Sequence, residues 1–213
     1  WGVPTGGMIQ ETPLIFRNKV YFGNWNMQFQ SLATETGKTA WTRQIGKWWG
    51  YSPGCSDPAT DGKNIFFTTI PMYDKDPDIY CVDPDTGNTV WSYQVTGGEN
   101  GCGQSSPCIK GDSVFAETVT GYVVRLSALD GKEIWRAKVG QNGGTNSPIS
   151  ANGKIFACGQ GGMLTSFDET TGRTLWSCST GTGYIFGSPT YWKGNIYVPS
   201  LDGSVTCIRE DMP

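Results

Sequence analysis

The sequence contains no histidine, and this absence excludes more kinds of active site than any other feature of the composition. A Ser-His-Asp triad, a Cys-His dyad, a histidine zinc site and a c-type haem attachment all require a histidine. Any chemistry performed by this chain would have to use carboxylates, lysines, tyrosines or a borrowed cofactor.

Charge and long apolar runs are also scarce. Only 16% of the residues are charged, the net charge is −3, and the basic residues are scattered along the chain. The sequence therefore offers no cationic stripe that would bind a nucleic-acid backbone. No stretch approaches the roughly 20 consecutive apolar residues that a membrane-spanning helix needs. We expect neither nucleic acid as a partner nor a membrane span.

The chain is instead rich in turn residues and aromatic residues. Its 213 residues include 30 glycines and 12 prolines, and 13% are aromatic. Aromatic residues favour strands over helices, so we expect a turn-rich protein with very little helix. A chain of this length can bury its own hydrophobic core as one domain.

A frame of the form T/D-G-x-x-x-W organises the sequence. Its Gly-x-x-x-Trp part lies at residues 37–41, 87–91, 131–135 and 172–176, each preceded by Thr or Asp. A loop follows each copy, and then a proline opens the next strand. These prolines are Pro13, Pro58, Pro107, Pro148 and Pro189, and they recur every 41 to 49 residues. Turn signals within each repeat separate four short strands, which is the pattern of one β-propeller blade.

The two ends of the chain predict how the blades close. Residues 1–6 match the W-x-x-x-x-G end of a repeat, and the last repeat stops short of its own Trp strand. Stacked blades leave open edges unless they form a ring. We therefore expect the N-terminal strand to complete the final blade. The alternatives are a segment cut from a longer ring and, because the chain starts at Trp1, a processed form of a longer protein.

The predicted fold is all-β, a single β-propeller domain covering residues 1–213. It has five four-stranded antiparallel blades and closes into a ring. The predicted blades cover approximately residues 7–46, 47–97, 98–140, 141–181, and 182–213 together with 1–6.

The repeats resemble a known family, the pyrroloquinoline-quinone-like repeat, or quinoprotein-type and BamB-like, β-propellers. The blades of that family carry a tryptophan-docking motif, A-x-D-x-x-T-G-x-x-x-W. Residues 81–91 and 166–176 match it closely, and residues 31–41 and 125–135 match it more loosely. The resemblance implies that five tryptophans pack between their own blade and the next as structural residues. They are Trp1, Trp41, Trp91, Trp135 and Trp176.

The resemblance does not by itself imply that a quinone binds. Quinoprotein enzymes of the family usually have eight blades, an adjacent pair of cysteines, calcium-binding carboxylates and a catalytic Asp. This chain shows five repeats and no adjacent cysteines, and its acidic residues near the repeat openings are chiefly Glu11, Asp57 and Glu99. None of these matches the catalytic position, so we expect no catalytic residue and no cofactor. The alternative is a quinoprotein-type alcohol or sugar dehydrogenase domain, or a fragment of one, which would bind pyrroloquinoline quinone.

The loops that connect successive blades gather on one face of a propeller, around its central channel, and they contain the candidate binding residues. These are Gln10, Glu11, Trp48, Trp49, Tyr51, Glu99, Asn100, Gln104, Gln141, Asn142, Asn146, Tyr184 and Phe186. Aromatic rings beside hydrogen-bonding side chains suit a neutral polyhydroxylated ligand. The same residue types are enriched where proteins bind each other. A glycan-like ligand, a partner protein and plain packing over the channel mouth all remain open.

One further motif bears on metal binding. Asp74, Asp76 and Asp78 have the spacing of calcium ligands, but Ile79 stands where an EF-hand loop requires Gly. A solvated hairpin tip is therefore the preferred interpretation, with calcium as the alternative.

The seven cysteines lack C-x-x-C spacing, and Cys102 lies in a loop near both Cys55 and Cys108. One disulfide there and an exported, extracytoplasmic protein are expected. The sequence thus favours a non-catalytic exported binding or scaffold propeller, which would act alone or as a subunit of a larger assembly.

Overall fold

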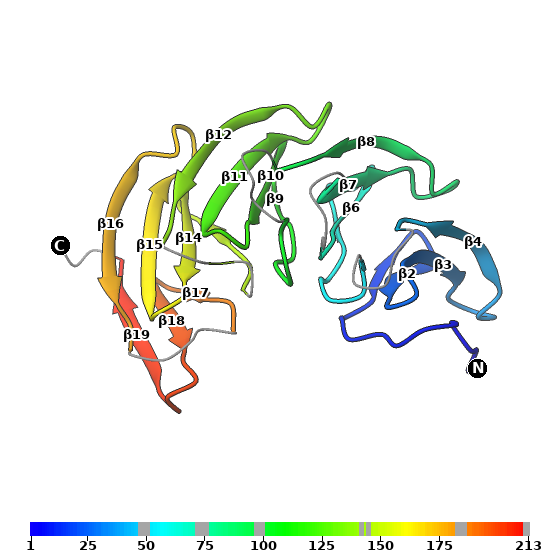
Figure 1. Cartoon of the computed structure of the whole chain (residues 1–213), viewed down its shortest axis with the longest axis horizontal. Helices are drawn as coiled ribbons and strands as arrows, with labels where there is room; N and C mark the ends of the chain where they lie inside the picture. The colour runs from blue at the N-terminus through cyan, green and yellow to red at the C-terminus, as the bar shows by residue number, and fades with distance from the viewer. Residues whose placement is uncertain are drawn as a thin grey trace.

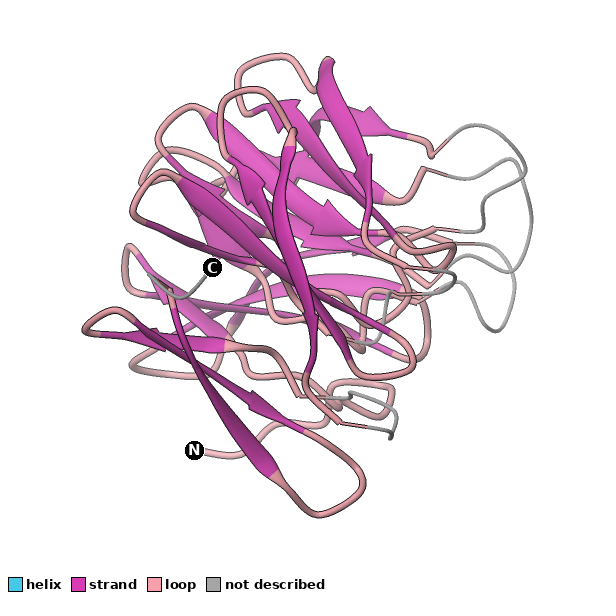
Figure 2. Cartoon of the chain, turned by 90° about the vertical axis from the view of Figure 1, so that its left-hand side faces the viewer, coloured by secondary structure: helices cyan, strands magenta, loops and turns pink. Residues whose placement is uncertain are grey.

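The computed structural model describes residues 1–46, 52–70, 77–95, 101–140, 143, 146–181 and 187–210. All regular structure in these residues is β, in nineteen strands that form five antiparallel sheets (Figures 1 and 2). The predicted all-β class and the propeller architecture of small antiparallel blades are confirmed. The described part of the chain contains no helix long and apolar enough to cross a bilayer.

Each sheet is a meander in which strands pair in the order of the sequence. Blade 1 consists of β1 (Leu14–Phe16), β2 (Lys19–Asn24), β3 (Gln28–Ala33) and β4 (Thr39–Gln44). Blade 2 consists of β5 (Ala59–Thr60), β6 (Ile65–Thr68), β7 (Ile79–Val82) and β8 (Thr89–Tyr93). Blade 3 consists of β9 (Cys108–Lys110), β10 (Ser113–Glu117), β11 (Tyr122–Ser127) and β12 (Glu133–Lys138). Blade 4 consists of β13 (Ile149–Ala151), β14 (Lys154–Gly159), β15 (Met163–Asp168) and β16 (Thr174–Ser179). Blade 5 contains β17 (Thr190–Trp192), β18 (Asn195–Pro199) and β19 (Val205–Arg209).

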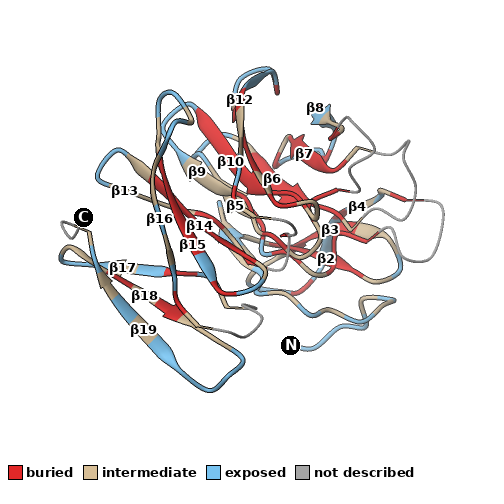
Figure 3. Ribbon diagram, turned by 60° about the vertical axis from the view of Figure 1, so that its left-hand side comes forward, coloured by how far each residue is buried: buried red, intermediate tan, exposed pale blue. Residues whose placement is uncertain are grey.

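The position of a strand within its blade determines how far it is buried. The second and third strands of the central blades are buried on both sides, as in β6 and β10, where every residue is buried. Along the outer strands β8 and β12, only the tryptophan is buried (Figure 3). A sheet whose middle strands are buried on both faces must lie between two other layers, so each blade depends on its neighbours.

The hydrophobic cores accordingly lie between blades. Tyr21, Phe29 and Trp41 of blade 1 form one buried cluster with residues of blade 2 that include Phe67 and Tyr80. The rings of Phe29 and Phe67 stack with centroids 4.0 Å apart. Similar clusters join blades 2 and 3, blades 3 and 4, and blades 4 and 5. Because each interface is built from neighbouring repeats, the stability of the stack depends mainly on nearest-neighbour contacts.

Closure of the ring by the N-terminal strand is not seen in the described residues. The fifth sheet has three strands, and β19 pairs only with β18. Residues 1–6 lie along blade 1 instead, where the carbonyl of Thr5 accepts a hydrogen bond from Asn24 Nδ2 at 2.8 Å. The blades follow one another along an open arc, with blade 1 and blade 5 at its two ends (Figure 1). Five blades stacked at this spacing do not bring β19 back to residues 1–6.

Candidate functional site

Four tryptophans dock in the same way; Trp41, Trp91 and Trp135 join consecutive blades, and Trp1 docks on blade 1. The indole Nε1 of Trp41 donates a hydrogen bond to the carbonyl of Pro84 in the next blade at 3.0 Å. Trp91 bonds to Ala128 at 2.9 Å, Trp135 to Glu169 at 3.1 Å and Trp1 to Thr34 at 2.8 Å. In each case the acceptor is the carbonyl of the residue three positions before the glycine of the repeat frame.

The glycine of each frame lies directly beneath the docked indole. A Cβ atom at Gly87 would lie 2.7 Å from the ring of Trp41, and one at Gly172 would lie 2.6 Å from the ring of Trp135. Both glycines also have a positive φ, 68° and 72°, a conformation that favours glycine. The T-G-x-x-x-W frame thus encodes two halves of neighbouring joints: its glycine receives the Trp of the preceding blade, and its own Trp docks on the next.

Trp176 differs from the other docking tryptophans. Its ring packs against Phe156 with centroids 5.9 Å apart, as Trp41 packs against Tyr21. Its Nε1 atom is buried, however, and has no hydrogen-bond partner among the residues that the structure describes. Blade 5 does not continue into a described docking turn, so only one half of this joint lies among the described residues.

A second set of joints lies on the loop face, which we define as the face where the chain passes from one blade to the next. In each of blades 1 to 4, the residue before the opening proline bonds to its counterpart in the next blade. The amide of Thr12 donates to Asp57 Oδ1 at 2.7 Å, and the amide of Asp57 donates to Ser106 Oγ at 2.8 Å. The amides of Ser106 and Ser147 donate to Ser147 Oγ and Ser188 Oγ, each at 2.9 Å.

This pre-proline ladder runs from blade 1 to blade 5 and fixes the roots of the loops in one row. The prolines predicted the number of blades, but the role of the residues before them was not predicted from the sequence. Thr, Asp, Ser, Ser and Ser at that position share a side-chain acceptor, and this shared property was the signal that could have revealed the ladder.

The ladder makes a stability prediction. Replacing Ser147 by alanine leaves the amide of Ser106 without its acceptor and is expected to lower the free energy of unfolding by about 1 to 2 kcal/mol. Chemical denaturation measures this change. Ser92 is exposed on β8, so Ser92→Ala is a matched control that should change stability by less than about 0.5 kcal/mol. Equal effects of the two substitutions would show that the ladder adds nothing.

One position further from the proline, another side chain caps the second strand of its own blade. Ser105 Oγ accepts the amide of Glu117 at 3.0 Å, and Ser56 Oγ accepts the amide of Thr68 at 3.3 Å. In blade 1 the corresponding residue is Glu11, whose Oε1 accepts the amide of Gly23. The structure therefore places Glu11 in a joint between its loop and its blade, and a glutamate takes a position that serine takes elsewhere.

The environment of Glu11 favours its neutral form. Its Oε2 atom is buried without a hydrogen-bond partner among the described residues. Burial raises the pKa of Glu11 from 4.5 to about 9; the bond from Gly23 opposes this shift, and the nearby carboxylate of Asp57 adds to it. A neutral carboxyl group can accept the Gly23 amide without placing a charge in a buried site.

The raised pKa predicts how stability depends on pH. Between pH 4.5 and pH 9 the folded protein retains a proton on Glu11 that the unfolded chain releases, so this group makes stability fall as pH rises through that range. Glu11→Gln keeps an acceptor for Gly23 and cannot ionise. The variant is expected to equal the wild type at pH 4 and to be more stable at pH 8, as urea denaturation at both pH values would show. Asp112→Asn, at an exposed carboxylate, is the control. A wild type and a Glu11→Gln variant with the same pH profile would contradict the assignment.

Of the other candidate binding residues, the structure describes Gln10, Gln104 and Asn146. Gln10 is exposed, and its backbone amide and Oε1 bond to Gly54 at 3.3 Å and Cys55 at 3.6 Å. Gln104 is half-buried and Asn146 is buried. The rest lie outside the described residues; they are Trp48, Trp49, Tyr51, Glu99, Asn100, Gln141, Asn142, Tyr184 and Phe186.

The possible calcium site is only partly described. Asp74 and Asp76 lie outside the described residues. Asp78 is buried, and its Oδ2 accepts the amide of Val95 at 2.6 Å. Within the described ranges, no three Cys, Asp or Glu residues are grouped so that they could hold a metal ion.

The expected disulfide is wrong. All seven cysteines are described and all are free thiols. Cys102 lies in the buried apolar cluster between blades 2 and 3, whereas Cys55 faces Gln10 on the loop face. Burial, with smaller contributions from Asp78 and Glu117, raises the pKa of the Cys102 thiol well above its usual value. Neighbouring loops in the sequence do not place two thiols together when one of them turns into the core.

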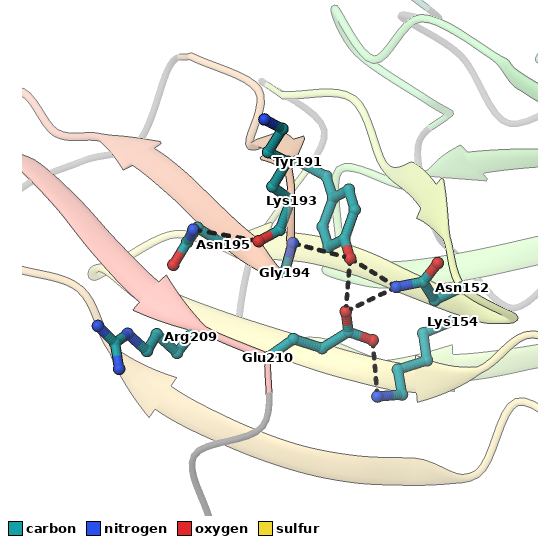
Figure 4. A pocket seen from close by; sticks show the side chains of 8 residues that line it. All are labelled: Asn152, Lys154, Tyr191, Lys193, Gly194, Asn195, Arg209 and Glu210. Atoms are coloured by element: carbon teal, nitrogen blue, oxygen red, sulfur yellow. Dashed lines mark hydrogen bonds and ion pairs between the residues drawn. The ribbon is translucent and has the colours of Figure 1, made fainter.

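A polar groove of about 540 Å³ lies on the opposite side, which we call the turn face, between blades 4 and 5 (Figure 4). Glu210 lies at its centre and receives hydrogen bonds from Lys154 at 2.7 Å, Tyr191 at 2.9 Å and Asn152 at 3.0 Å. Burial of Glu210 raises its pKa, but these bonds outweigh burial and the pKa lies below its usual value.

The same side of the stack between blades 2 and 3 has a groove of only about 160 Å³. Ala128 and Leu129, from the docking turn of blade 3, line this smaller groove. The larger groove adjoins the place where blade 5 lacks a described docking turn. No motif in the sequence predicted this groove.

Comparison with known proteins places this architecture in a family. The family model described as outer membrane protein assembly factor BamB matches residues 1–211. The chain belongs to this family. No curated protein matches the sequence.

The solved structures that resemble this BamB-family chain include BamB from Moraxella catarrhalis, with a TM-score of 0.79 and 20% identity over 98% of this chain. A computationally designed protein, Ika8, matches 92% of the chain with a TM-score of 0.69 and 14% identity. The quinohemoprotein alcohol dehydrogenase ADHIIG from Pseudomonas putida HK5 matches 90% with a TM-score of 0.71 and 12% identity. At these identities the likeness shows the fold alone. The chain spans 60%, 57% and 43% of the lengths of these three proteins.

Proposed function

We propose that this BamB-family chain is a non-catalytic scaffold propeller that binds a partner protein on its loop face. The family is named for a factor in outer membrane protein assembly, which supports a role in an assembly and a location outside the cytoplasm. The observation that carries the proposal is the pre-proline ladder from Thr12 to Ser188. It holds the roots of successive loops in a fixed row, as a binding surface needs in order to present several loops at once.

The polar groups beside the channel also support a scaffold rather than an enzyme. Glu11 and Ser105 cap strands, and Asp57 and Ser106 join blades. Each group already has a structural partner. The dehydrogenase shares the fold with this chain at 12% identity, and a shared fold does not establish a shared reaction.

The test uses site-specific photo-crosslinking in the cells that produce the protein. A benzophenone amino acid at Gln10 or Gln104 lies on the loop face, and the same probe at Lys110 or Lys132 lies on the turn face. We expect one protein adduct of defined mass from Gln10 and Gln104 and none from the two controls, because the partner lies over the loops.

Two results would contradict the proposal. Adducts of the same mass from all four positions would remove the loop face as the binding surface. Loss of the adducts on addition of soluble glycans, with glycan bound at Gln10, would show that the ligand is polyhydroxylated rather than a protein.

A further inference from the structure

A cation crosses three of the four described joints between blades on the turn face. In the joint between blades 1 and 2, Lys19 Nζ donates to Asp85 Oδ1 at 2.7 Å and to the carbonyl of Pro84 at 3.4 Å. In the joint between blades 3 and 4, Arg125 Nη1 donates to the carbonyl of Glu169 at 3.1 Å. Pro84 and Glu169 are the residues whose carbonyls also accept a docked indole, so the cation and the tryptophan share one acceptor.

The joint between blades 2 and 3 lacks this cation. Lys154 Nζ of blade 4 donates to Glu210 Oε1 of blade 5 at 2.7 Å, and it holds the same register position as Lys19 of blade 1. In blade 2 that position is taken by Asn64. Among the described residues, no Lys or Arg of blade 2 forms an ion pair with blade 3. A contact that recurs along the stack is therefore missing at one interior joint.

The acceptor for the missing cation is still present. A backbone carbonyl has two lone pairs and can accept two hydrogen bonds. The carbonyl of Pro84 accepts both Trp41 Nε1 and Lys19 Nζ. The equivalent carbonyl, of Ala128, accepts Trp91 Nε1 at 2.9 Å and no second donor from the described residues. The joint thus keeps an acceptor that binds a cation elsewhere in the same protein.

The groove of about 160 Å³ lies at this joint, and its lining is suited to a cation. We call it the joint groove. Two carboxylates, Asp61 and Asp112, line it together with Ala128 and Leu129. Lys63 also lines the groove, so the charged side chains of the lining sum to −1. Leu129 is 76% exposed, and it offers an apolar surface on which the aliphatic stem of a cation can lie.

The size of the joint groove limits what can enter it. Pockets for cofactors and drug-sized ligands have volumes of about 300 to 1,000 Å³, and the joint groove has about half of the lower value. It can hold one charged head group and a short stem. Lys63 and the exposed Lys110, two residues from Asp112, would repel a broadly basic protein surface. A narrow cation avoids that repulsion.

We propose that the joint groove binds a small organic cation, a primary ammonium or guanidinium group on an aliphatic stem. The head group takes the place that Lys19 has in the first joint: it donates to the carbonyl of Ala128 and faces the carboxylates of Asp61 and Asp112. Hydrogen bonds from a charged donor are stronger than those from a neutral one. The stem lies on Leu129. The joint groove is on the turn face, so this proposal does not rest on the partner of the loop face.

The test is a titration followed by NMR of the indole N–H signals. Butylguanidinium and butylammonium carry the two head groups on one stem, and butylurea is a neutral analogue of the same shape as the first. We expect the Trp91 signal to shift saturably with at least one cation, with a dissociation constant on the order of 1 to 10 mM, because a second donor on the shared carbonyl changes the bond from Trp91. Trp41 and Trp135 are internal controls, because their acceptor carbonyls already bind a cation. Butylurea should shift none of these signals.

Two variants locate the site. Asp112→Asn removes one carboxylate and is expected to weaken binding roughly two- to fivefold. Asn64→Lys gives the joint its own cation, as Lys19 does in blade 1. This variant is expected to bind butylguanidinium more than about tenfold more weakly, and without ligand its Trp91 signal should already be shifted towards that of the bound wild type. Thr174→Lys, at an exposed position of β16, adds the same charge elsewhere and should change neither property.

Several results would overturn the proposal. The Trp91 signal could show no saturable shift with either cation up to about 50 mM, or it could shift equally with butylurea. Equal shifts of Trp41 and Trp135 would show that the cations bind without selecting this joint. Binding that is undiminished in both Asp112→Asn and Asn64→Lys would place the ligand outside the joint groove. Each of these results leaves the proposed function untouched, because that function is tested on the loop face.

Discussion

Replacing Trp91 with alanine is expected to lower the free energy of unfolding by about 3 to 5 kcal/mol. Trp91 lies in the core between blades 2 and 3, its ring packs on Phe66 with centroids 5.8 Å apart, and its Nε1 bonds to the carbonyl of Ala128. The substitution removes the ring from the core and also leaves a buried carbonyl without its donor. One side chain therefore holds two blades together.

Chemical denaturation followed by circular dichroism measures the loss. Leu129 is 76% exposed on the docking turn next to Ala128, so Leu129→Ala is a control of similar location that should change stability by less than about 0.5 kcal/mol. If Trp91→Ala costs no more than Leu129→Ala, the docked indole is not the joint between the blades.

Gly131→Ala is expected to destabilise the same joint from its other side, by about 2 to 5 kcal/mol. Gly131 has a φ of 71°, and a Cβ there would lie 2.6 Å from the ring of Trp91. The methyl group must therefore displace the docked indole, and its backbone must remain in a conformation that alanine disfavours. The displaced indole and the strained backbone conformation both result from adding one Cβ atom.

Gly111→Ala separates these two costs. Gly111 has a φ of 54° at the turn between β9 and β10, and nothing lies within 4 Å of a Cβ at that position. Its substitution should cost only the backbone strain, about 1 to 2 kcal/mol. Equal losses for Gly131→Ala and Gly111→Ala in the same denaturation experiment would mean that the indole yields at no cost, which would contradict tight docking.

The repeat frame predicted the joints because it encodes them locally. A glycine with a positive φ and a Trp four residues later define one hairpin, and the hairpin fixes where the indole points. Gly87 and Trp91 show this: they belong to one frame, and each takes part in a different interface. Local sequence was sufficient because each interface repeats the same short-range geometry.

Ring closure could not be predicted in the same way. It depends on the small rotation between blades added over five blades, and no single repeat encodes that sum. The match of residues 1–6 to an outer strand was correct as a pattern, since Trp1 does dock on Gly37. The pattern could not say which blade lies next to it.

The sequence predicted part of the candidate site. Glu11 was identified as a loop-face residue, but the strand amide that it accepts and the burial of its carboxyl group follow from packing. Cys102 was placed correctly in a loop, but its side chain turns into the core between two blades. Side-chain direction in a loop depends on contacts with distant residues, which spacing alone does not give.

The central claim is that the polar groups on the loop face hold the blades together in a binding scaffold. Reconstitution with pyrroloquinoline quinone and calcium tests this claim most directly. The purified protein is incubated with both and passed through a desalting column, and quinone absorbance and dye-linked oxidation of alcohols and sugars are then measured. The account predicts no retained quinone band and no turnover above that of the free cofactor. A stoichiometric quinone band with saturable turnover, both lost in Glu11→Gln, would contradict it and would identify the chain as an oxidoreductase.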